Sequence, residues 1–223
     1  MNHQLHTTPY LDQRQQWPAS GRHILARYDE QSIWVYQAYR PSIAHYAIEH
    51  QRFGGEFSYS RMSWVKPNFL WMMYRAGWAT KEGQEHILAI RLPRPLFDDL
   101  LRTAVPSSHD PQRFTSREQW QDAVARSDVR LQWDPDHDPN GKALERRAIQ
   151  LGLRGHALRR FGELDLLQIE DITAYVSEQR QHLPDRLGEL KLPVERVYWP
   201  GDDVAAANVG LDRLQFKTGV RDQ

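Results

Sequence analysis

The fold class is decided by the stretch IWVYQAYRPSIAHYAIEH, residues 33–50. Residues 33–39 are mostly β-branched and aromatic, which predicts a strand, and Pro41 stands where a helix can begin. The apolar residues that follow recur at helical spacing: Ile43, Ala44, Ala47 and Ile48. Upstream, HILARY over residues 23–28 predicts a second strand, and the short polar break at residues 29–31 predicts that the two strands form a hairpin.

Strands and helices continue to mix along the chain without the regular alternation of a doubly wound sheet. Turn and cap signals predict strands over residues 62–65, 86–92, 129–133 and 194–199, and helices over residues 69–75, 96–104, 116–126 and 173–182. Residues 134–141 have the composition of a loop, and residues 147–153 fit either a strand or a helix. We therefore expect a single α+β domain over residues 21–223, with a mixed or antiparallel central sheet and flanking helices. Residues 1–20 are expected to form a flexible N-terminal arm.

Composition restricts the possible functions. The 223 residues include 29 Lys and Arg and 29 Asp and Glu, so any nucleic-acid partner must be attracted by a local patch rather than by net charge. The absence of cysteine excludes disulfides, thiol catalysis and Cys-ligated metals. The polar start of the chain lacks the apolar core of a signal peptide, and the most apolar window, residues 69–73, is too short to span a bilayer. We expect a soluble, cytoplasmic protein.

A first candidate site lies at the end of the strand over residues 33–39. Strand alternation places Tyr36 and Arg40 on one face and Tyr39 on the other. An arginine at the end of a strand, directly before a helix, can hold a phosphate or a ribose, and aromatic rings beside a guanidinium suit a flat, charged ligand. The alternative is that Arg40 pairs with a surface acid.

A second candidate site lies around the helix expected at residues 69–75. The apolar residues of this helix are expected in the core: Phe69, Met72 and Met73. Core packing leaves Lys66, Trp71, Arg75 and Trp78 unexplained. Lys66 stands near the start of the helix, where a cation and exposed amide N–H groups together make an anion site.

A third group, Asp134, Asp136 and His137, is followed by Asp138 on the expected loop. The carboxylate spacing resembles the opening of a calcium loop, but Pro139 occupies the sixth position, where glycine is needed. A solvated turn is the favoured interpretation, and a magnesium or manganese site is the alternative.

The fourth candidate is the basic segment over residues 142–160. Here Glu145 is the single acid among six fixed positive charges: Lys142, Arg146, Arg147, Arg154, Arg159 and Arg160. Such a local excess predicts binding of a phosphate-bearing partner through Arg146, Arg147, Arg154 and Arg159. The alternative is a solvated charged face.

Four strings in the chain resemble a bacterial and fungal family catalogued as a domain of unknown function, DUF4291. These strings are VYQAYRPSIA (35–44), MSWVKPNFLWMMYRAGWATK (62–81), LQWDPDHDP (131–139) and LERRAIQLGLRG (144–155). The resemblance covers about residues 20–200. It names a family without supplying a function.

The order of elements also resembles, in layout, that of the ADP-ribosyltransferases. That resemblance implies NAD as the cofactor, Arg40 against its pyrophosphate, an aromatic ring against the nicotinamide, and a carboxylate, Glu145 or Glu195, that stabilises an oxocarbenium-like state. The NAD contacts would come from Arg40, Tyr36, Tyr39, Lys66, Trp71 and Arg75. The Ser-Thr-Ser and His-Tyr-Glu sets of those enzymes are not found.

The leading functional prediction is an NAD-dependent, ADP-ribosyltransferase-like enzyme with Arg40 and Glu145 as catalytic residues and no required metal. Its acceptor would be nucleic acid, with RNA favoured, or another phosphate-bearing molecule. One alternative is a non-catalytic module that binds RNA or a nucleotide through the same surface. Another is a metal-dependent hydrolase or nuclease that uses Asp134, Asp136 and His137.

Overall fold

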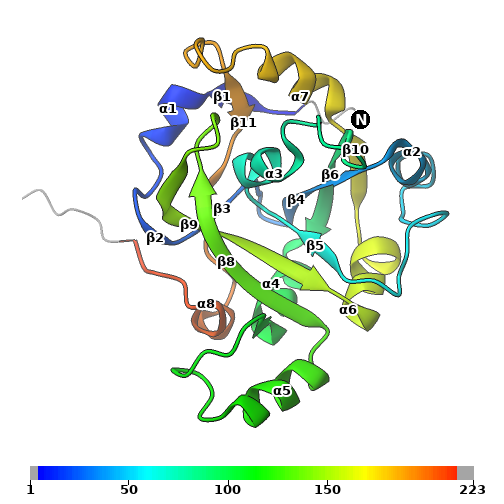
Figure 1. Ribbon diagram of the computed structural model, residues 1–223, viewed down its shortest axis with the longest axis vertical. Coiled ribbons are helices and arrows are strands. Elements are labelled where there is room, and N and C mark those ends of the chain that lie inside the picture. Colours follow the sequence, from blue (N-terminus) through cyan, green and yellow to red (C-terminus); the bar gives the residue numbers. More distant parts are fainter. Residues whose placement is uncertain (1–4, 215–223) are drawn as a thin grey trace, which may run out of the picture.

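Two sheets form the centre of the molecule in the computed structural model, which describes residues 5–214 (Figure 1). The first sheet is antiparallel and has the order β10 (Gln168–Asp171), β6 (His86–Pro93), β4 (Ser32–Tyr39). Its longest ladder pairs β4 with β6, from Ser32 opposite Pro93 to Tyr39 opposite His86. The strands predicted at residues 33–39 and 86–92 are confirmed.

The second sheet is mixed and is built on the long hairpin of β8 (Val129–His137) and β9 (Ala143–Leu153). Short parallel strands, β2 (Gly21–Arg22) and β7 (Val105–Pro106), flank this hairpin on its two sides. β5 (Ser63–Val65) pairs antiparallel with the end of β9.

The two sheets are joined where β4 runs beside the end of β5. The Tyr36 amide donates a hydrogen bond of 2.7 Å to the Lys66 carbonyl, which forms an isolated antiparallel bridge. α3 (Phe69–Ala76) begins three residues after Lys66 and lies between β4 and β8 (Figure 1). This junction brings side chains from β4, β5, α3, β8 and β9 close together.

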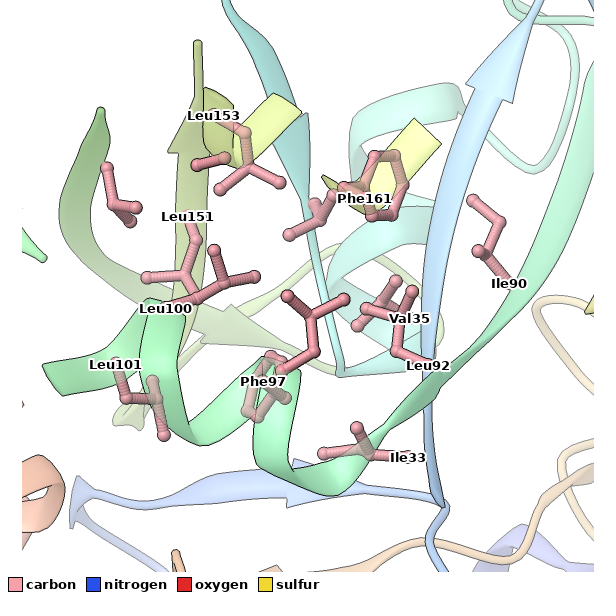
Figure 2. Packing of buried hydrophobic residues seen from close by; sticks show 14 of the residues in the cluster. Ile33, Val35, Ile90, Leu92, Phe97, Leu100, Leu101, Leu151, Leu153 and Phe161 are labelled. Atoms are coloured by element: carbon pink, nitrogen blue, oxygen red, sulfur yellow. The ribbon is translucent and has the colours of Figure 1, made fainter. Parts of the chain in front are cut away.

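Two hydrophobic clusters lie on opposite faces of β4 and β6, because successive strand residues face opposite ways. Figure 2 shows the first cluster, in which Val35 and Leu92 pack with Leu151 of β9 and with α4 (Arg94–Thr103). The second cluster takes the alternate residues Trp34 and Tyr36 and packs them against the apolar face of α3. The described residues thus form the single α+β domain that the sequence predicts.

Further helices surround the two sheets (Figure 1). They are α2 (Pro41–His50), α5 (Arg117–Arg126), α6 (Gly155–Arg159) with a π-helical turn at Arg160–Leu164, α7 (Thr173–Arg180) and α8 (Asp203–Val209). The cap signals are confirmed at α3 and α5, where Asn68 accepts from the Trp71 amide at 2.6 Å and Ser116 from the Gln119 amide at 3.1 Å. No helix among residues 5–214 is long and apolar enough to cross a membrane.

The expected hairpin at residues 23–39 forms only in part. Its turn is closed by the Asp29 amide, which donates 2.9 Å to the Ser32 carbonyl, and by the bridge between Tyr28 and Ile33. The ladder of β3 (Ile24–Ala26), however, is made with the late strand β12 (Arg196–Tyr198). The predicted strand at residues 194–199 therefore exists, and it takes the place beside β3 that sequence proximity suggested for β4.

The structure corrects the prediction of a loop at residues 134–141. β8 continues to His137, with a bulge near Pro135, because β9 supplies partners for the polar side chains of the strand's second half. Only residues 138–142 form the turn, where the Asp138 carboxylate accepts from the amides of Asn140 and Lys142.

The prediction of a flexible arm at residues 1–20 is also corrected, because residues 5–20 include a strand and a helix that contact the rest of the chain. β1 (Thr7–Pro9) pairs with β11 (Lys191–Pro193), and α1 (Tyr10–Arg14) follows it. The Gln13 side chain donates 3.0 Å to the Leu192 carbonyl, and the Trp17 indole donates 3.0 Å to the Glu195 carbonyl. The segment is ordered because these contacts with the late part of the chain bury its side chains. Residues 1–4 lie outside the described residues.

Candidate functional site

A polar cleft of about 640 Å³ opens at the junction of the two sheets. It is lined from β4 by Gln37 and Tyr39, from β5 and its flanks by residues 61–64 and Lys66, from α3 by Trp71 and Arg75, and from the β8–β9 hairpin by Gln132, Asp134 and Gln150. We call it the Lys66 cleft.

Lys66 is a buried cation without an ionic partner. Lys66 is 6% exposed. Within the described residues its ammonium makes only one hydrogen bond, a long one of 3.5 Å to the Trp64 carbonyl. Burial, together with the neighbouring Arg75, lowers the pKa of Lys66 to about 8, although Asp134 opposes the shift. A buried charge without a partner is costly to the fold, which is typical of a group that serves a ligand.

Two more cations stand at the cleft. Arg61 and Arg75 are exposed, and neither guanidinium makes a hydrogen bond or ion pair with another described residue. Asp134 is the one carboxylate among the described lining residues. With Lys66 protonated, three cations face one anion, so the cleft carries an excess of two positive charges in a chain whose formal net charge is zero.

Asp134 is held in a fixed orientation by two amides. Its Oδ1 accepts 2.9 Å from the Gln132 side chain, and its Oδ2 accepts 2.7 Å from the Gln150 side chain. Gln132 and Gln150 are directly opposite in the β8–β9 register, and Asp134 is two residues further along β8 on the same face. The sequence predicts Asp134 only as part of a metal loop. Strand alternation over residues 132–134 is the signal that places Asp134 on the same face as Gln132, but it does not identify Gln150 as the second partner.

The opposite wall of the cleft is a network of uncharged polar groups. The Gln37 amide donates 2.8 Å to the Ser63 hydroxyl and 3.0 Å to the Trp64 carbonyl, and the Tyr39 hydroxyl donates 2.8 Å to Gln37. Burial raises the pKa of Tyr39, so its hydroxyl keeps its proton. The indole N–H of Trp71 is buried and has no hydrogen-bond partner within the described residues.

The structure thus brings together four of the predicted site residues: Tyr39, Lys66, Trp71 and Arg75. Arg40 lies next to them, in an adjoining cavity of about 360 Å³ that shares Tyr39 and residues 61–63 with the Lys66 cleft. Its guanidinium pairs with Glu56 at 2.8 Å, which is the alternative that the sequence left open.

Tyr36 does not belong to the cleft. It is fully buried, with its ring edge-on to Phe69 at 5.4 Å, in the second hydrophobic cluster. Because Gln37 and Tyr39 face the cleft, strand alternation turns Tyr36 away from it. The prediction that Tyr36 contacts a cofactor is corrected.

The basic segment of residues 142–160 does not form one patch, because each arginine has a different environment. Arg146 is 5% exposed and donates 2.9 and 2.6 Å to Asp136, while Arg147, the next residue along β9, is exposed. Arg154 donates to three carbonyls at the end of α5, and Arg159 pairs with Glu163 at 3.7 Å. The expected phosphate surface of Arg146, Arg147, Arg154 and Arg159 is therefore not assembled.

Neither of the two carboxylates proposed from the sequence lines the Lys66 cleft. Glu145 is exposed on β9. Glu195 is 4% exposed and accepts 2.7 Å from the Phe69 amide and 3.2 Å from the Asn68 side chain, so it caps the start of α3. Burial raises the pKa of Glu195 well above its usual range.

The residues of the expected metal loop have separate partners. Asp136 is engaged by Arg146, and the His137 ring is stacked on Tyr74 with the centroids 3.5 Å apart. Across residues 5–214 there is no group of three or more His, Asp or Glu side chains that could hold a metal ion.

Comparison with known proteins identifies the family of the chain. A family model described as a domain of unknown function (DUF4291) matches residues 23–198, a range that includes every residue of the Lys66 cleft. No curated protein matches the chain.

Proposed function

The chain belongs to the domain-of-unknown-function family DUF4291, and we propose that its Lys66 cleft is the nucleotide site of an enzyme that transfers ADP-ribose from NAD to nucleic acid or another phosphate-bearing acceptor. The observation that carries the proposal is the buried, unpaired ammonium of Lys66, in one cleft with a fixed carboxylate.

The charge of the cleft favours a phosphate-bearing ligand. Arg61 and Arg75 have no partner among the described residues, so their N–H groups are free for charge-assisted hydrogen bonds to phosphate oxygens. An anion beside Lys66 would also relieve the cost of its burial. A pyrophosphate, with two negative charges, matches the excess of two positive charges.

The remaining lining suits a nucleoside. The partly exposed ring of Trp64 offers an apolar surface, and the buried Trp71 offers an N–H donor without a partner among the described residues. Gln132 and Gln150 each donate one amide N–H to Asp134, and the rest of each amide can recognise hydroxyl and carboxamide groups. A volume of about 640 Å³ lies within the usual range for small-molecule sites.

Asp134 is the carboxylate that would act on the ribose. In the proposed reaction the bond between C1′ and the nicotinamide nitrogen breaks, and neutral nicotinamide leaves with the electron pair. A bond forms between C1′ and a nucleophilic atom of the acceptor, which releases its proton to solvent. The negative charge of Asp134 would stabilise the oxocarbenium-like transition state, the role that the sequence assigned to Glu145.

The acceptor would lie in the adjoining cavity. Arg40 and Arg61 both line it, and Tyr39 and Ser63 form the wall shared with the Lys66 cleft. An acceptor phosphate bound by Arg40 would compete with Glu56 for the guanidinium. RNA, which carries both phosphates and 2′-hydroxyl nucleophiles, is the favoured acceptor.

A non-catalytic nucleotide- or RNA-binding module is the second candidate. Both carboxylate oxygens of Asp134 already accept amide hydrogen bonds, an arrangement that also suits a purely structural group. This module would bind the same ligands without turnover.

Release of nicotinamide from NAD, measured with and without RNA, separates the two candidates. We expect the Asp134→Asn variant to release nicotinamide about a hundredfold more slowly than the wild type, the usual effect of losing one charge-stabilising group. The matched Glu145→Gln variant should be unchanged, because Glu145 is outside the cleft. Binding of NAD without any turnover would establish the binding module instead, and loss of turnover only in Glu145→Gln would contradict the role of Asp134.

A further inference from the structure

The amine of Lys66 is unusual among the lysines that the structure describes. Lys81, Lys142 and Lys191 are exposed, whereas Lys66 is 6% exposed and lines the cleft. A lysine buried for structural reasons normally pairs with a carboxylate. No Asp or Glu oxygen among the described residues forms a salt bridge with Lys66.

The surroundings of Lys66 favour the neutral amine. Desolvation and the nearby Arg75 both disfavour the ammonium, and the pKa of about 8 leaves about a tenth of the molecules with a neutral amine at pH 7. A neutral amine has a free electron pair and is a nucleophile, and desolvation beside another cation is a known way to activate a lysine.

The electrophile that fits this amine is a phosphorus atom. The same cleft holds the unpaired guanidiniums of Arg61 and Arg75, which would stabilise the charge of a reacting phosphate and of its leaving group. A carbonyl substrate would make no comparable use of these two cations.

We infer that Lys66 attacks the adenylyl phosphorus of a nucleoside 5′-phosphoanhydride in the cleft and forms a covalent lysine–nucleotide. An N–P bond forms and the P–O bond to the leaving group breaks. The leaving group is pyrophosphate when the donor is ATP and nicotinamide mononucleotide when the donor is NAD. It takes the bonding electrons, while the amine proton goes to solvent and a divalent cation in solution balances the charge of the leaving phosphate.

This inference rests on the proposed nucleotide site but not on ADP-ribose transfer. The two reactions break different bonds of the same dinucleotide, so their products differ. ADP-ribose transfer releases nicotinamide, and attack by Lys66 releases nicotinamide mononucleotide.

The test is intact-mass spectrometry of the full chain after incubation with magnesium and either ATP or NAD, followed by peptide mapping. We expect the mass of one adenylyl group, on Lys66, through a linkage that acid cleaves and alkali spares. The rate of adduct formation should rise with pH and level off above about pH 8, where the amine is neutral. Lys66→Arg, which keeps the cation but loses the nucleophile, should form no adduct, and Lys142→Arg should label as the wild type does.

Each other outcome overturns the inference. An adduct on a different lysine, or no adduct in a wild-type protein that binds the nucleotide in calorimetry, would exclude Lys66 as the nucleophile and leave the nucleotide site standing. Absence of nucleotide binding would overturn both the site and the inference. The decisive readings come from the wild-type chain, so they do not depend on the folding of the variants.

Discussion

Lys66 is a residue that costs stability, as functional groups in a cleft often do. Its folded pKa of about 8 lies below the ordinary lysine value of 10.5, so the unfolded chain binds more protons between these two pH values. Stability should therefore rise with pH across that window. Below pH 8 both states are protonated, and the full penalty of about 3 kcal/mol applies, since each pKa unit corresponds to roughly 1.4 kcal/mol.

The Lys66→Met variant tests this cost. Methionine has a similar length and no charge, so we expect the free energy of unfolding at pH 7 to increase by about 1–3 kcal/mol. The gain over the wild type should shrink as the pH rises from 8 toward 10.5. Chemical denaturation of both proteins across this range measures the effect. A variant less stable than the wild type at pH 7 would mean that Lys66 holds the fold together through a partner that it needs.

At the residue scale the sequence predicts about half of the site. Lys66, Trp71 and Arg75 could be found because helix periodicity places the neighbouring apolar residues in the core and leaves these three unexplained. Asp134 could not be assigned as a lone carboxylate, because its environment depends on Gln150 of another strand. Tyr36 was misplaced because the sequence does not say which face of a two-sided buried strand borders the cleft.

At the scale of elements, local signals were reliable and long-range pairing was not. The cap of α3 at Asn68 is a local signal, but the start of the helix is also capped by Glu195, 126 residues beyond Phe69. The loop expected after Trp133 had the right residues for a turn, yet the ladder with β9 extends the strand to His137. Tertiary pairing overrode local propensity there.

Arg154 allows a long-range contact with the end of one helix, α5, to be tested. It donates hydrogen bonds of 3.0–3.1 Å to the carbonyls of Val124, Ala125 and Ser127 at the end of α5, where backbone acceptors lack partners within the helix, and Arg130 donates to the first and the last of them as well. We expect Arg154→Ala to lower the free energy of unfolding by about 1–3 kcal/mol, the range for charge-assisted hydrogen bonds.

Nucleotide affinity of this variant should equal that of the wild type, because Arg154 is outside the Lys66 cleft. Urea denaturation and calorimetric titration provide the two readings. An unchanged stability together with a weakened affinity would return Arg154 to the phosphate-binding role that the basic segment first suggested.

At the scale of the whole molecule, the composition predicts a globular protein but does not indicate where the cleft lies. The equal numbers of acidic and basic residues are consistent with any globular domain, and the three cations of residues 61–75 share a cleft with the carboxylate of Asp134 only when β8 lies beside that segment. Likewise, residues 5–20 have the polar composition of an arm, but β11 and the segment before β12 give them partners. Both features depend on contacts between distant parts of the chain.

Calorimetric titration of NAD into the wild type and the Arg75→Ala variant tests the central claim that the Lys66 cleft is the nucleotide site. Losing a charge-assisted hydrogen bond to phosphate should weaken binding by about ten- to a hundredfold. The matched Arg159→Ala variant, which removes an exposed arginine from outside the cleft, should bind as the wild type does. Equal affinities in the wild type and Arg75→Ala, or no binding of NAD by the wild type, would contradict the claim.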